Sequence, residues 1–466
     1  MIPMRKKSTP SSNKWLTLLF ACLLLSCTVC NAATTETLKP DTITLSLTEA
    51  GTLHERIGNN KKLKIECLRL KGMLNIDDIQ FIREMAGCYY DTKGHKYDGH
   101  LRYLDISGAT LTNTDNKEVS IYPRDPSEYE GTPWPSAEAY INDKGTPVAI
   151  FAYLYDMEEI VLPAKLKSIG DDAFIFCRSL KSINIPESVQ KIGLRAFFGC
   201  SSLKSMKLPI GITEIKSGLL SGCTNLTSID IPYTTEEIGH NAFSKCTSLK
   251  SIELPYSLNG MGISVFYGCT ALTSVTIPKD IRYISDYTFY NCTSLTSIVI
   301  PSGVQKIEGK TFSYCTGLKS LTLQEGTTDI YDYAFTGCTL LTTITLPSTL
   351  GTICDAAFGG CNSLESIYAF NPRGIGIKGK PFEEYTQSQC TLYVPEGSMY
   401  NYKRLEEWNA FNHIVEFSPT GIDGVHSAAE RREVERYDTS GRRLTSPTKG
   451  LNIVRFNDGT TRKVMK

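Results

Sequence analysis

Residues 246–255 read CTSLKSIELP, and residues 292–301 read CTSLTSIVIP. The same pattern returns every 23 residues, each time with a cysteine first and a leucine three residues later. A fixed period of this length is typical of a solenoid, in which each repeat forms one coil stacked on the last. The cysteines of this series are Cys177, Cys200, Cys223, Cys246, Cys269, Cys292, Cys315, Cys338 and Cys361.

Other positions of the repeat are equally regular. A phenylalanine stands three residues before each cysteine except Cys223, where Leu220 takes its place. An apolar pair with one residue between, such as Ile252 and Leu254, follows the leucine and usually ends at a proline. This alternation predicts a short strand with one buried face, which the proline ends because it lacks a backbone donor.

The segment that leads into each cysteine is too short for a full helix, so we expect a single helical or 3₁₀ turn there. One coil cannot bury its apolar residues alone, whereas coils stacked about 4.8 Å apart can. A degenerate coil with Leu154 in place of the cysteine precedes the series. The prediction is an α/β solenoid of about ten 23-residue coils with one parallel β-sheet, capped at both ends and followed by a small β-rich module.

The string GCSSLKSMKLP at residues 199–209, with its near copies, resembles the BspA-like leucine-rich repeats of bacterial surface proteins, also called the Treponema pallidum type. The resemblance covers about residues 147–370. It departs from the commoner leucine-rich consensus, because the cysteine precedes the strand and proline follows it. The resemblance implies a non-enzymatic cell-surface protein of Bacteroidetes that adheres to host extracellular-matrix proteins or to other bacteria.

The flanking regions are less regular. Residues 33–146, with LRYLDISGATL at 101–111, are expected to form a leucine-rich N-terminal cap. Within it, the apolar spacing from Ile76 to Met85 predicts a helix capped by Asn75 or Asp77. Residues 371–417 are expected to form a C-terminal cap. Residues 424–466 carry strand signals and resemble short C-terminal modules of Bacteroidetes exported proteins, some of which direct type IX secretion.

The N-terminus is typical of an exported protein. Basic residues precede an apolar run from Trp15 to Cys27 that is too short to span a bilayer, so residues 1–32 are interpreted as a signal peptide. Leu24-Leu-Ser-Cys27 resembles a lipoprotein box with Cys27 as the lipidated residue. The alternative is ordinary cleavage after Cys30-Asn-Ala32. Both interpretations place the chain outside the cytoplasm, at the outer-membrane surface or secreted, although a lipobox fits poorly with a type IX signal.

The cysteine series is interpreted as a structural ladder of buried, reduced side chains. Zinc sites use paired ligands at short spacing, which the repeats lack. Cys354 breaks the period and is expected at the surface. Cys67 and Cys88 are candidates for a disulfide in the N-terminal region, and the sequence leaves that pairing open.

No feature predicts an enzyme, a cofactor or a metal site. The chain has 49 basic and 49 acidic residues, so no basic field favours nucleic acid. None of its six histidines lies in an HExxH motif, and GxSxG and P-loop motifs are missing from the sequence.

A ligand face is predicted along the strands, where one residue of each coil points outward between two buried ones. These residues are Asn184, Lys207, Asp230, Glu253, Thr276, Val299, Thr322, Thr345 and Tyr368. A second outward row is nearly all serine. A recognition surface needs side chains that vary on a constant backbone, as these do. The alternative interpretation is sequence drift at solvated positions. The expected partner is a protein; glycan binding on aromatic platforms or a purely structural role in the envelope are the alternatives.

Overall fold

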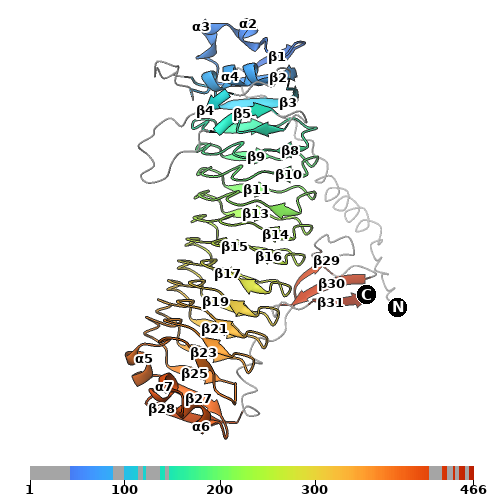
Figure 1. Ribbon diagram of the computed structural model, residues 1–466. Helices are drawn as coiled ribbons and strands as arrows, with labels where there is room; N and C mark the ends of the chain where they lie inside the picture. The colour runs from blue at the N-terminus through green and yellow to red at the C-terminus, as the bar shows by residue number, and fades with distance from the viewer. Residues whose placement is uncertain are drawn as a thin grey trace, which may run out of the picture. The chain divides into compact units, whose positions relative to one another are not determined.

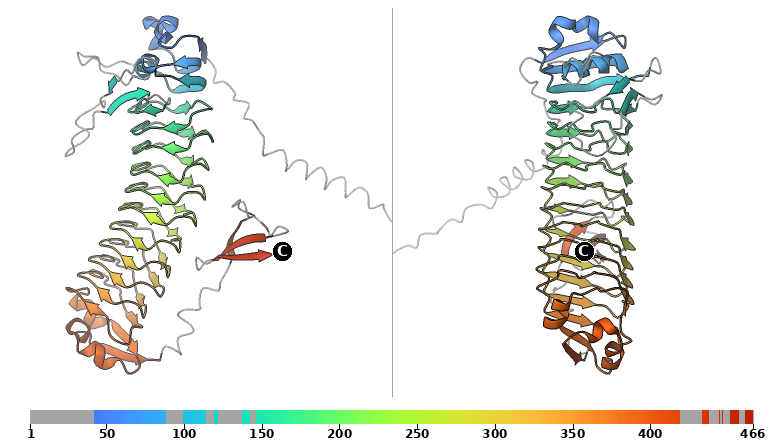
Figure 2. Two further views of the ribbon diagram at one scale, coloured as in Figure 1. Left: turned by 45° about the vertical axis from the view of Figure 1, so that its right-hand side comes forward. Right: turned by 60° about the vertical axis from the view of Figure 1, so that its left-hand side comes forward.

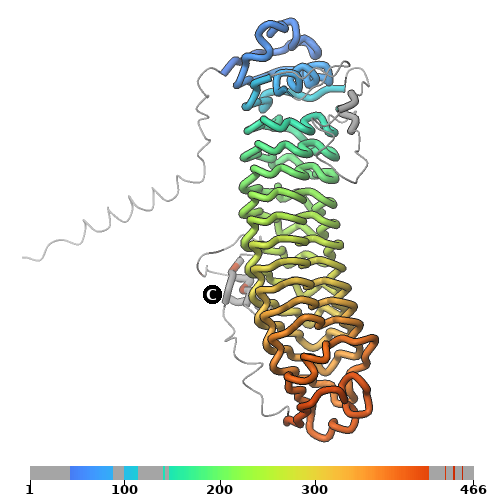
Figure 3. Tube along the Cα trace, turned by 90° about the vertical axis from the view of Figure 1, so that its left-hand side faces the viewer, coloured from blue at the N-terminus to red at the C-terminus, as the bar shows by residue number. Residues whose placement is uncertain are grey.

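The computed structural model describes residues 42–87, 99–113, 119–121, 137–141, 146–418, 433–437, 444, 446, 451–456 and 461–465. From β7 to β26 the chain winds into coils stacked one on the next (Figures 1 and 3). Each coil has three backbone stretches: a strand, a second and shorter strand, and a segment of turns that ends at the cysteine. The predicted solenoid is confirmed.

The first stretch forms a parallel ladder in which equivalent residues pair from coil to coil, as Ser297 does with Ser320. We call its outward side chains the strand face. Its strands are β7 (Glu159–Val161), β9 (Ser182–Asn184), β11 (Ser205–Lys207), β13 (Ser228–Asp230), β15 (Ser251–Ile252), β17 (Ser274–Val275), β19 (Ser297–Ile300), β21 (Ser320–Leu323), β23 (Thr343–Leu346) and β25 (Ser366–Ala369). Hydrogen-bonded pairing is interrupted three times, after β9, β13 and β17.

The sequence predicted one parallel sheet, but the structure contains a second parallel ladder. It is built from two-residue strands. In each strand, the apolar residue at the end of the repeat is buried in the core, as Ile307 is beside Ile330. Two residues are too few to show an alternating pattern, so the sequence could not reveal them. These strands are β8 (Ser168–Ile169), β10 (Lys191–Ile192), β12 (Glu214–Ile215), β14 (Glu237–Ile238), β16 (Gly260–Met261), β18 (Tyr283–Ile284), β20 (Lys306–Ile307), β22 (Asp329–Ile330), β24 (Thr352–Ile353) and β26 (Gly376–Ile377).

The third stretch is a run of hydrogen-bonded turns, and the expected helical or 3₁₀ turn is wrong. The residues five and one before each cysteine have left-handed backbones, for example Lys310 (φ 56) and Tyr314 (φ 61) before Cys315. Side chains at these positions, and at the positions six and two before the cysteine, form what we call the turn face. Left-handed residues only four positions apart prevent a helix, which needs consecutive right-handed residues.

Because of these left-handed residues, the N–H of every second residue in this stretch points along the stack toward the next coil. In the coil of Cys200, the N–H groups of Arg195, Phe197 and Gly199 donate to the carbonyls of residues 217, 219 and 221 in the next coil, at 3.0, 3.0 and 2.7 Å. The same three bonds recur in each coil from Ala149 to the coil that ends at Cys338, and the last coil keeps two of them. Donors therefore always face the C-terminal end of this ladder, and acceptors its N-terminal end.

Both ends of the turn ladder meet a charge of the matching sign. At the N-terminal end, the buried Arg83 Nη1 donates to the carbonyls of Ile150 (3.1 Å) and Ala152 (2.7 Å). At the C-terminal end, the Gly360 N–H donates to Glu383 Oε1 at 2.9 Å. These contacts satisfy backbone groups that would otherwise lack partners.

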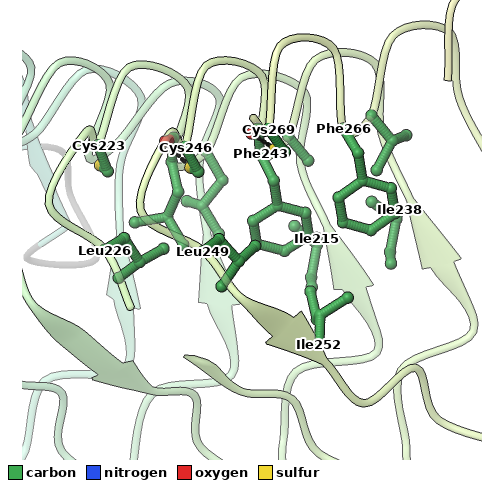
Figure 4. Close-up of a cluster of buried hydrophobic side chains, with 14 of the residues drawn as sticks. Ile215, Cys223, Leu226, Ile238, Phe243, Cys246, Leu249, Ile252, Phe266 and Cys269 are labelled. Atoms are coloured by element: carbon green, nitrogen blue, oxygen red, sulfur yellow. Dashed lines mark hydrogen bonds between the residues drawn. The ribbon is translucent and has the colours of Figure 1, made fainter. Parts of the chain in front are cut away.

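Inside the coils, the repeat residues form ladders of their own (Figure 4). Phenylalanine rings of successive coils stack, with centroids 5.1 Å apart between Phe289 and Phe312. Each ladder cysteine donates its Sγ–H to a carbonyl of the preceding coil, as Cys269 does to Phe243 at 3.1 Å. The carbonyl belongs to the residue three before the preceding cysteine or, for Cys177, to the equivalent Phe151. The thiol is thus both a small core side chain and a hydrogen-bond donor.

The strand ladder continues into the N-terminal region, where β1 (Ile43–Leu47), β2 (Cys67–Leu74) and β3 (Tyr103–Leu111) pair in parallel up to β7. Helices α2 (Leu53–Ile57), α3 (Asn59–Lys62) and α4 (Ile76–Met85) accompany them. The predicted helix is confirmed as α4: Asn75 is its N-cap and forms a capping box with Asp78. Strands β4 (Val119–Ile121), β5 (Ala137–Ile141) and β6 (Pro147–Val148) pair antiparallel.

At the other end, β27 (Thr391–Pro395) and β28 (His413–Phe417) extend the strand ladder beyond β25 (Figure 2). Helices α5 (Glu384–Gln389), α6 (Met399–Lys403) and α7 (Glu406–Asn409) lie in the same segment, and Trp408 is fully buried among Phe382, Tyr402 and Phe411. The C-terminal module has three antiparallel strands, β29 (Glu433–Tyr437), β30 (Leu451–Phe456) and β31 (Thr461–Met465), as the strand signals predicted.

Candidate functional site

The predicted ligand face lies on the strand face. Its first seven residues, from Asn184 to Thr322, are exposed, while the core residues on either side of them point inward. This is the arrangement expected of a strand with one buried side. The serine row beside it is exposed from Ser182 to Ser320.

The last two residues of the row differ from the prediction. Thr345 is only 7% exposed, because the larger Tyr368 lies beside it in register in the next coil. Tyr368 is half-buried and stacks on Tyr393 of β27, with ring centroids 4.5 Å apart. These two positions therefore belong to the junction with the C-terminal segment, and the open part of the face ends at Thr322.

One part of the strand face is hollowed, over β11 and β13, and the hollow reaches Glu253 just after β15. The hollow measures about 360 Å³ and has Lys207, Asp230 and Glu253 at its sides. Its floor includes Ile229 and Ile231, which are only partly buried, whereas the equivalent Ile298 and Ile300 are buried. Apolar surface beside charges of both signs is thus accessible here.

The charges around the hollow are solvated. Lys207 Nζ lies 3.1 Å from Glu187 Oε1, and both side chains are more than 60% exposed. Hydrogen bonding to the Glu187 carboxylate, with a smaller contribution from Asp230, raises the pKa of Lys207, which keeps the amine charged. Exposed pairs of this kind contribute little to stability, so these side chains are available to a ligand.

The cysteine ladder is chemically inert in this environment. Burial raises the pKa of Cys269 and of Cys315 to about 12, because the thiolate would lose its hydration. A thiol with such a pKa is a poor nucleophile and a poor metal ligand at neutral pH. The prediction of buried, reduced ladder side chains is therefore confirmed for the cysteines whose Sγ donates to a carbonyl, from Cys177 to Cys361.

Three other cysteine predictions have different outcomes. Cys354 was expected at the surface, but it is 6% exposed, because its small side chain lies between the larger Tyr331 and Lys378 at the equivalent positions of the neighbouring coils. Cys88 lies outside the described residues, so its bridge to Cys67 stays a prediction. The candidate lipidation site Cys27 and both cleavage sites also lie outside them.

Within the described ranges, no group of three histidine, cysteine or acidic residues is arranged to hold a metal ion. His240 of the turn face has a structural contact instead, since its Nδ1 accepts the Ile263 N–H at 2.8 Å. Among the described helices, none has the length and apolar character needed to cross a bilayer.

The repeats match a known family model. Residues 147–273 and 259–390, together more than half of the 466 residues, match the model described as the BspA type leucine rich repeat region. The chain belongs to this family. Leucine-rich repeats of the BspA type form protein-binding scaffolds and are a non-catalytic fold. No curated protein matches the chain.

Solved structures of leucine-rich repeat proteins are similar to parts of this chain. A leucine rich cell surface protein from Faecalibacterium prausnitzii is 21% identical, with 70% of this chain and 81% of that chain covered and a TM-score of 0.38. A leucine-rich repeat protein from Bacteroides ovatus is 24% identical, with 70% and 89% covered and a TM-score of 0.39. The leucine rich repeat protein of T. pallidum is 26% identical over 46% of this chain and 91% of its own, with a TM-score of 0.34.

Proposed function

We propose that this BspA-type protein is a surface-exposed adhesin that binds a protein ligand, of host extracellular matrix or of another bacterium, through its strand face. The observation that carries the proposal is the hollow bounded by Lys207, Asp230 and Glu253. It joins accessible apolar surface to charges of both signs, which is the composition of protein interfaces. Binding would use contacts spread along rigid coils and no chemistry.

The hollow favours binding in which most of the binding energy comes from one place, rather than from equal contacts along the whole strand face. Interfaces concentrate their energy in a few residues surrounded by weaker contacts. Ile229 and Ile231 supply the apolar patch, and Lys207 supplies a charge that steers an acidic partner. The flanking serine row has short side chains, so a partner can approach the backbone closely there.

The test uses the chain from residue 33 onward, immobilised matrix proteins, intact bacteria and a glycan panel. Saturable binding to a protein should weaken at least tenfold when Lys207, Asp230 and Glu253 are replaced together by alanine. Thr276→Ala and Thr322→Ala, further along the same row, provide the matched control and should leave the affinity unchanged. Equal affinity of both variants and the parent would exclude this part of the face. Binding to glycans alone would favour a glycan-binding protein, and no binding at all a structural role.

A further inference from the structure

A second and larger hollow of about 1060 Å³ lies on the turn face. It centres on the coil between β12 and β13, where the four turn-face positions are Ser217, Gly218, Ser221 and Gly222. The equivalent positions of the next coil are His240, Asn241, Ser244 and Lys245. One coil without large outward side chains therefore leaves a gap between two coils that carry them.

The fold does not require glycine at these positions. Both Gly218 (φ 67) and Gly222 (φ 76) are left-handed, yet other coils place Lys310 and Tyr314 at the equivalent left-handed positions. A Cβ built on Gly222 would meet no atom nearer than 3.5 Å outside its chain neighbours. One on Gly218 would meet the flexible side chain of Arg195 at 3.0 Å and the Phe198 ring at 3.8 Å. Space for a side chain exists, and the chain leaves it empty.

The walls of the hollow are basic. Arg178, Arg195 and Lys245 line it, and no acidic residue is among its described lining residues. Arg195 is held in place by Asp172 through two hydrogen bonds, Nε to Oδ1 at 2.9 Å and Nη2 to Oδ2 at 2.7 Å. That pair is neutral as a unit, and Arg178 and Lys245 are the other two cations among the lining residues.

Aromatic rings complete the walls. Phe176 and Phe198 meet edge to face with centroids 5.2 Å apart on one side, and the Arg178 guanidinium lies over the Phe176 ring. On the other side Tyr267 stacks on Tyr290, with centroids 4.9 Å apart and planes 3° apart. Serine hydroxyls lie between these walls. The lining of the hollow thus combines aromatic residues, serines and cationic residues.

The backbone offers nothing to an incoming peptide strand. The N–H groups of Gly218, Leu220 and Gly222 already donate to carbonyls of the next coil at 2.8 Å each, so no sheet edge is open here. A peptide that binds by strand addition needs such an edge. A ligand of the turn face must therefore be recognised by side chains alone.

We propose that this hollow binds an anionic oligosaccharide, whose carboxylate or sulfate groups contact Arg178 and Lys245 while a sugar ring packs against Tyr267. Serine hydroxyls suit the sugar hydroxyls, and guanidinium groups bind carboxylate and sulfate through paired hydrogen bonds. This site is additional to the protein-binding strand face and lies on a different stretch of each coil.

The test measures binding by titration calorimetry of the chain from residue 33 onward with three hexasaccharides: a sulfated heparin fragment, a carboxylated galacturonate oligomer and neutral maltohexaose. A poly-glutamate peptide is the fourth probe. Gly222→Tyr fills the hollow with a residue that the fold already accepts at the equivalent Tyr314. Gly360→Tyr makes the same change at a left-handed glycine (φ 69) far along the stack and is the matched control.

The proposal predicts that a sulfated or carboxylated probe binds, that Gly222→Tyr weakens its binding at least tenfold and that Gly360→Tyr does not. The double variant Arg178→Gln, Lys245→Gln should reduce both the affinity and its dependence on salt. The proposal is overturned if no sugar binds, if maltohexaose or poly-glutamate binds equally well, or if Gly222→Tyr has no effect. Strand-face variants leave this hollow intact, so this result and the adhesin test can fail independently.

Discussion

The strand face and the turn face come from the same repeat but join neighbouring coils differently. On the strand face, hydrogen-bonded pairing between coils is interrupted after β9, β13 and β17. On the turn face, three N–H groups of each coil from Ala149 to Gly337 donate to the next coil without a gap. The turn side, with the phenylalanine and cysteine ladders behind it, therefore holds the stacked coils together. The residues of the strand face can then vary, and the face can contain a hollow, with little loss of stability.

The largest expected effect is loss of stability at alkaline pH, because the ladder thiols all lie behind the turn face. Burial raises the pKa of Cys269 and of Cys315 from 9.0 to about 12. The unfolded chain loses these protons first, so the stabilisation is complete below pH 9 and is lost as the pH rises toward 12. Each thiol costs about 1.4 kcal/mol per pH unit in that window. Urea unfolding followed by circular dichroism at pH 8.0, 9.5 and 10.5 measures the slope, and Cys315→Ala should make it shallower. A flat profile to pH 11 would contradict the buried ladder.

Removing one ring from the core of the turn side should have the next largest effect. Phe289→Ala leaves a cavity between Phe266 and Phe312, on which the ring stacks. We expect a loss of about 3–5 kcal/mol in the free energy of unfolding. Ser297→Ala, on the strand face of the following stretch, should change it by less than about 0.5 kcal/mol. Similar losses in the free energy of unfolding for the two variants would contradict the view that the turn side contributes more to stability than the strand face.

A smaller effect is expected at the N-terminal end of the turn ladder. Arg83→Met removes the donor to two carbonyls in a buried position and should cost about 2–4 kcal/mol. Hydrogen exchange of residues 149–153 should accelerate. Glu383→Gln, at the exposed other end, keeps an oxygen that accepts the Gly360 N–H, and it should cost no more than about 1 kcal/mol. The reverse order would disprove the role of Arg83 as a buried cap.

The smallest expected effect is a gain in stability. Ala356 has φ 48, a left-handed conformation that costs an alanine about 1–2 kcal/mol and a glycine nothing. Glycine loses more entropy on folding, so Ala356→Gly should raise the free energy of unfolding by about 0.5–1 kcal/mol. Ala357→Gly, one residue later at a buried position without positive φ, should lower it. Thermal unfolding of both variants tests whether left-handed strain on the turn face is real.

The sequence predicted the solenoid because the cysteine, phenylalanine and leucine periods can be satisfied only by stacking. It did not reveal the left-handed positions, since residues such as Lys310 and Tyr333 give no sign of them. Arg83 looked like an ordinary polar residue of a helix, and only the fold places it against Ile150 and Ala152. The exposed residues of the strand face could be predicted from the alternation of apolar and polar residues. This prediction failed at Thr345, because the burial of Thr345 depends on its neighbour Tyr368.

The two charged contacts at Arg83 and Glu383 also bear on self-association. A ladder whose donors all face one way presents complementary ends, so bare copies would join head to tail into an open-ended fibre. Arg83 occupies the acceptors at one end and Glu383 takes a donor at the other, so each end is already satisfied within its own chain. Loss of Arg83 would leave two carbonyls without this donor, and loss of Glu383 would leave one N–H without its acceptor, at the two ends of the ladder.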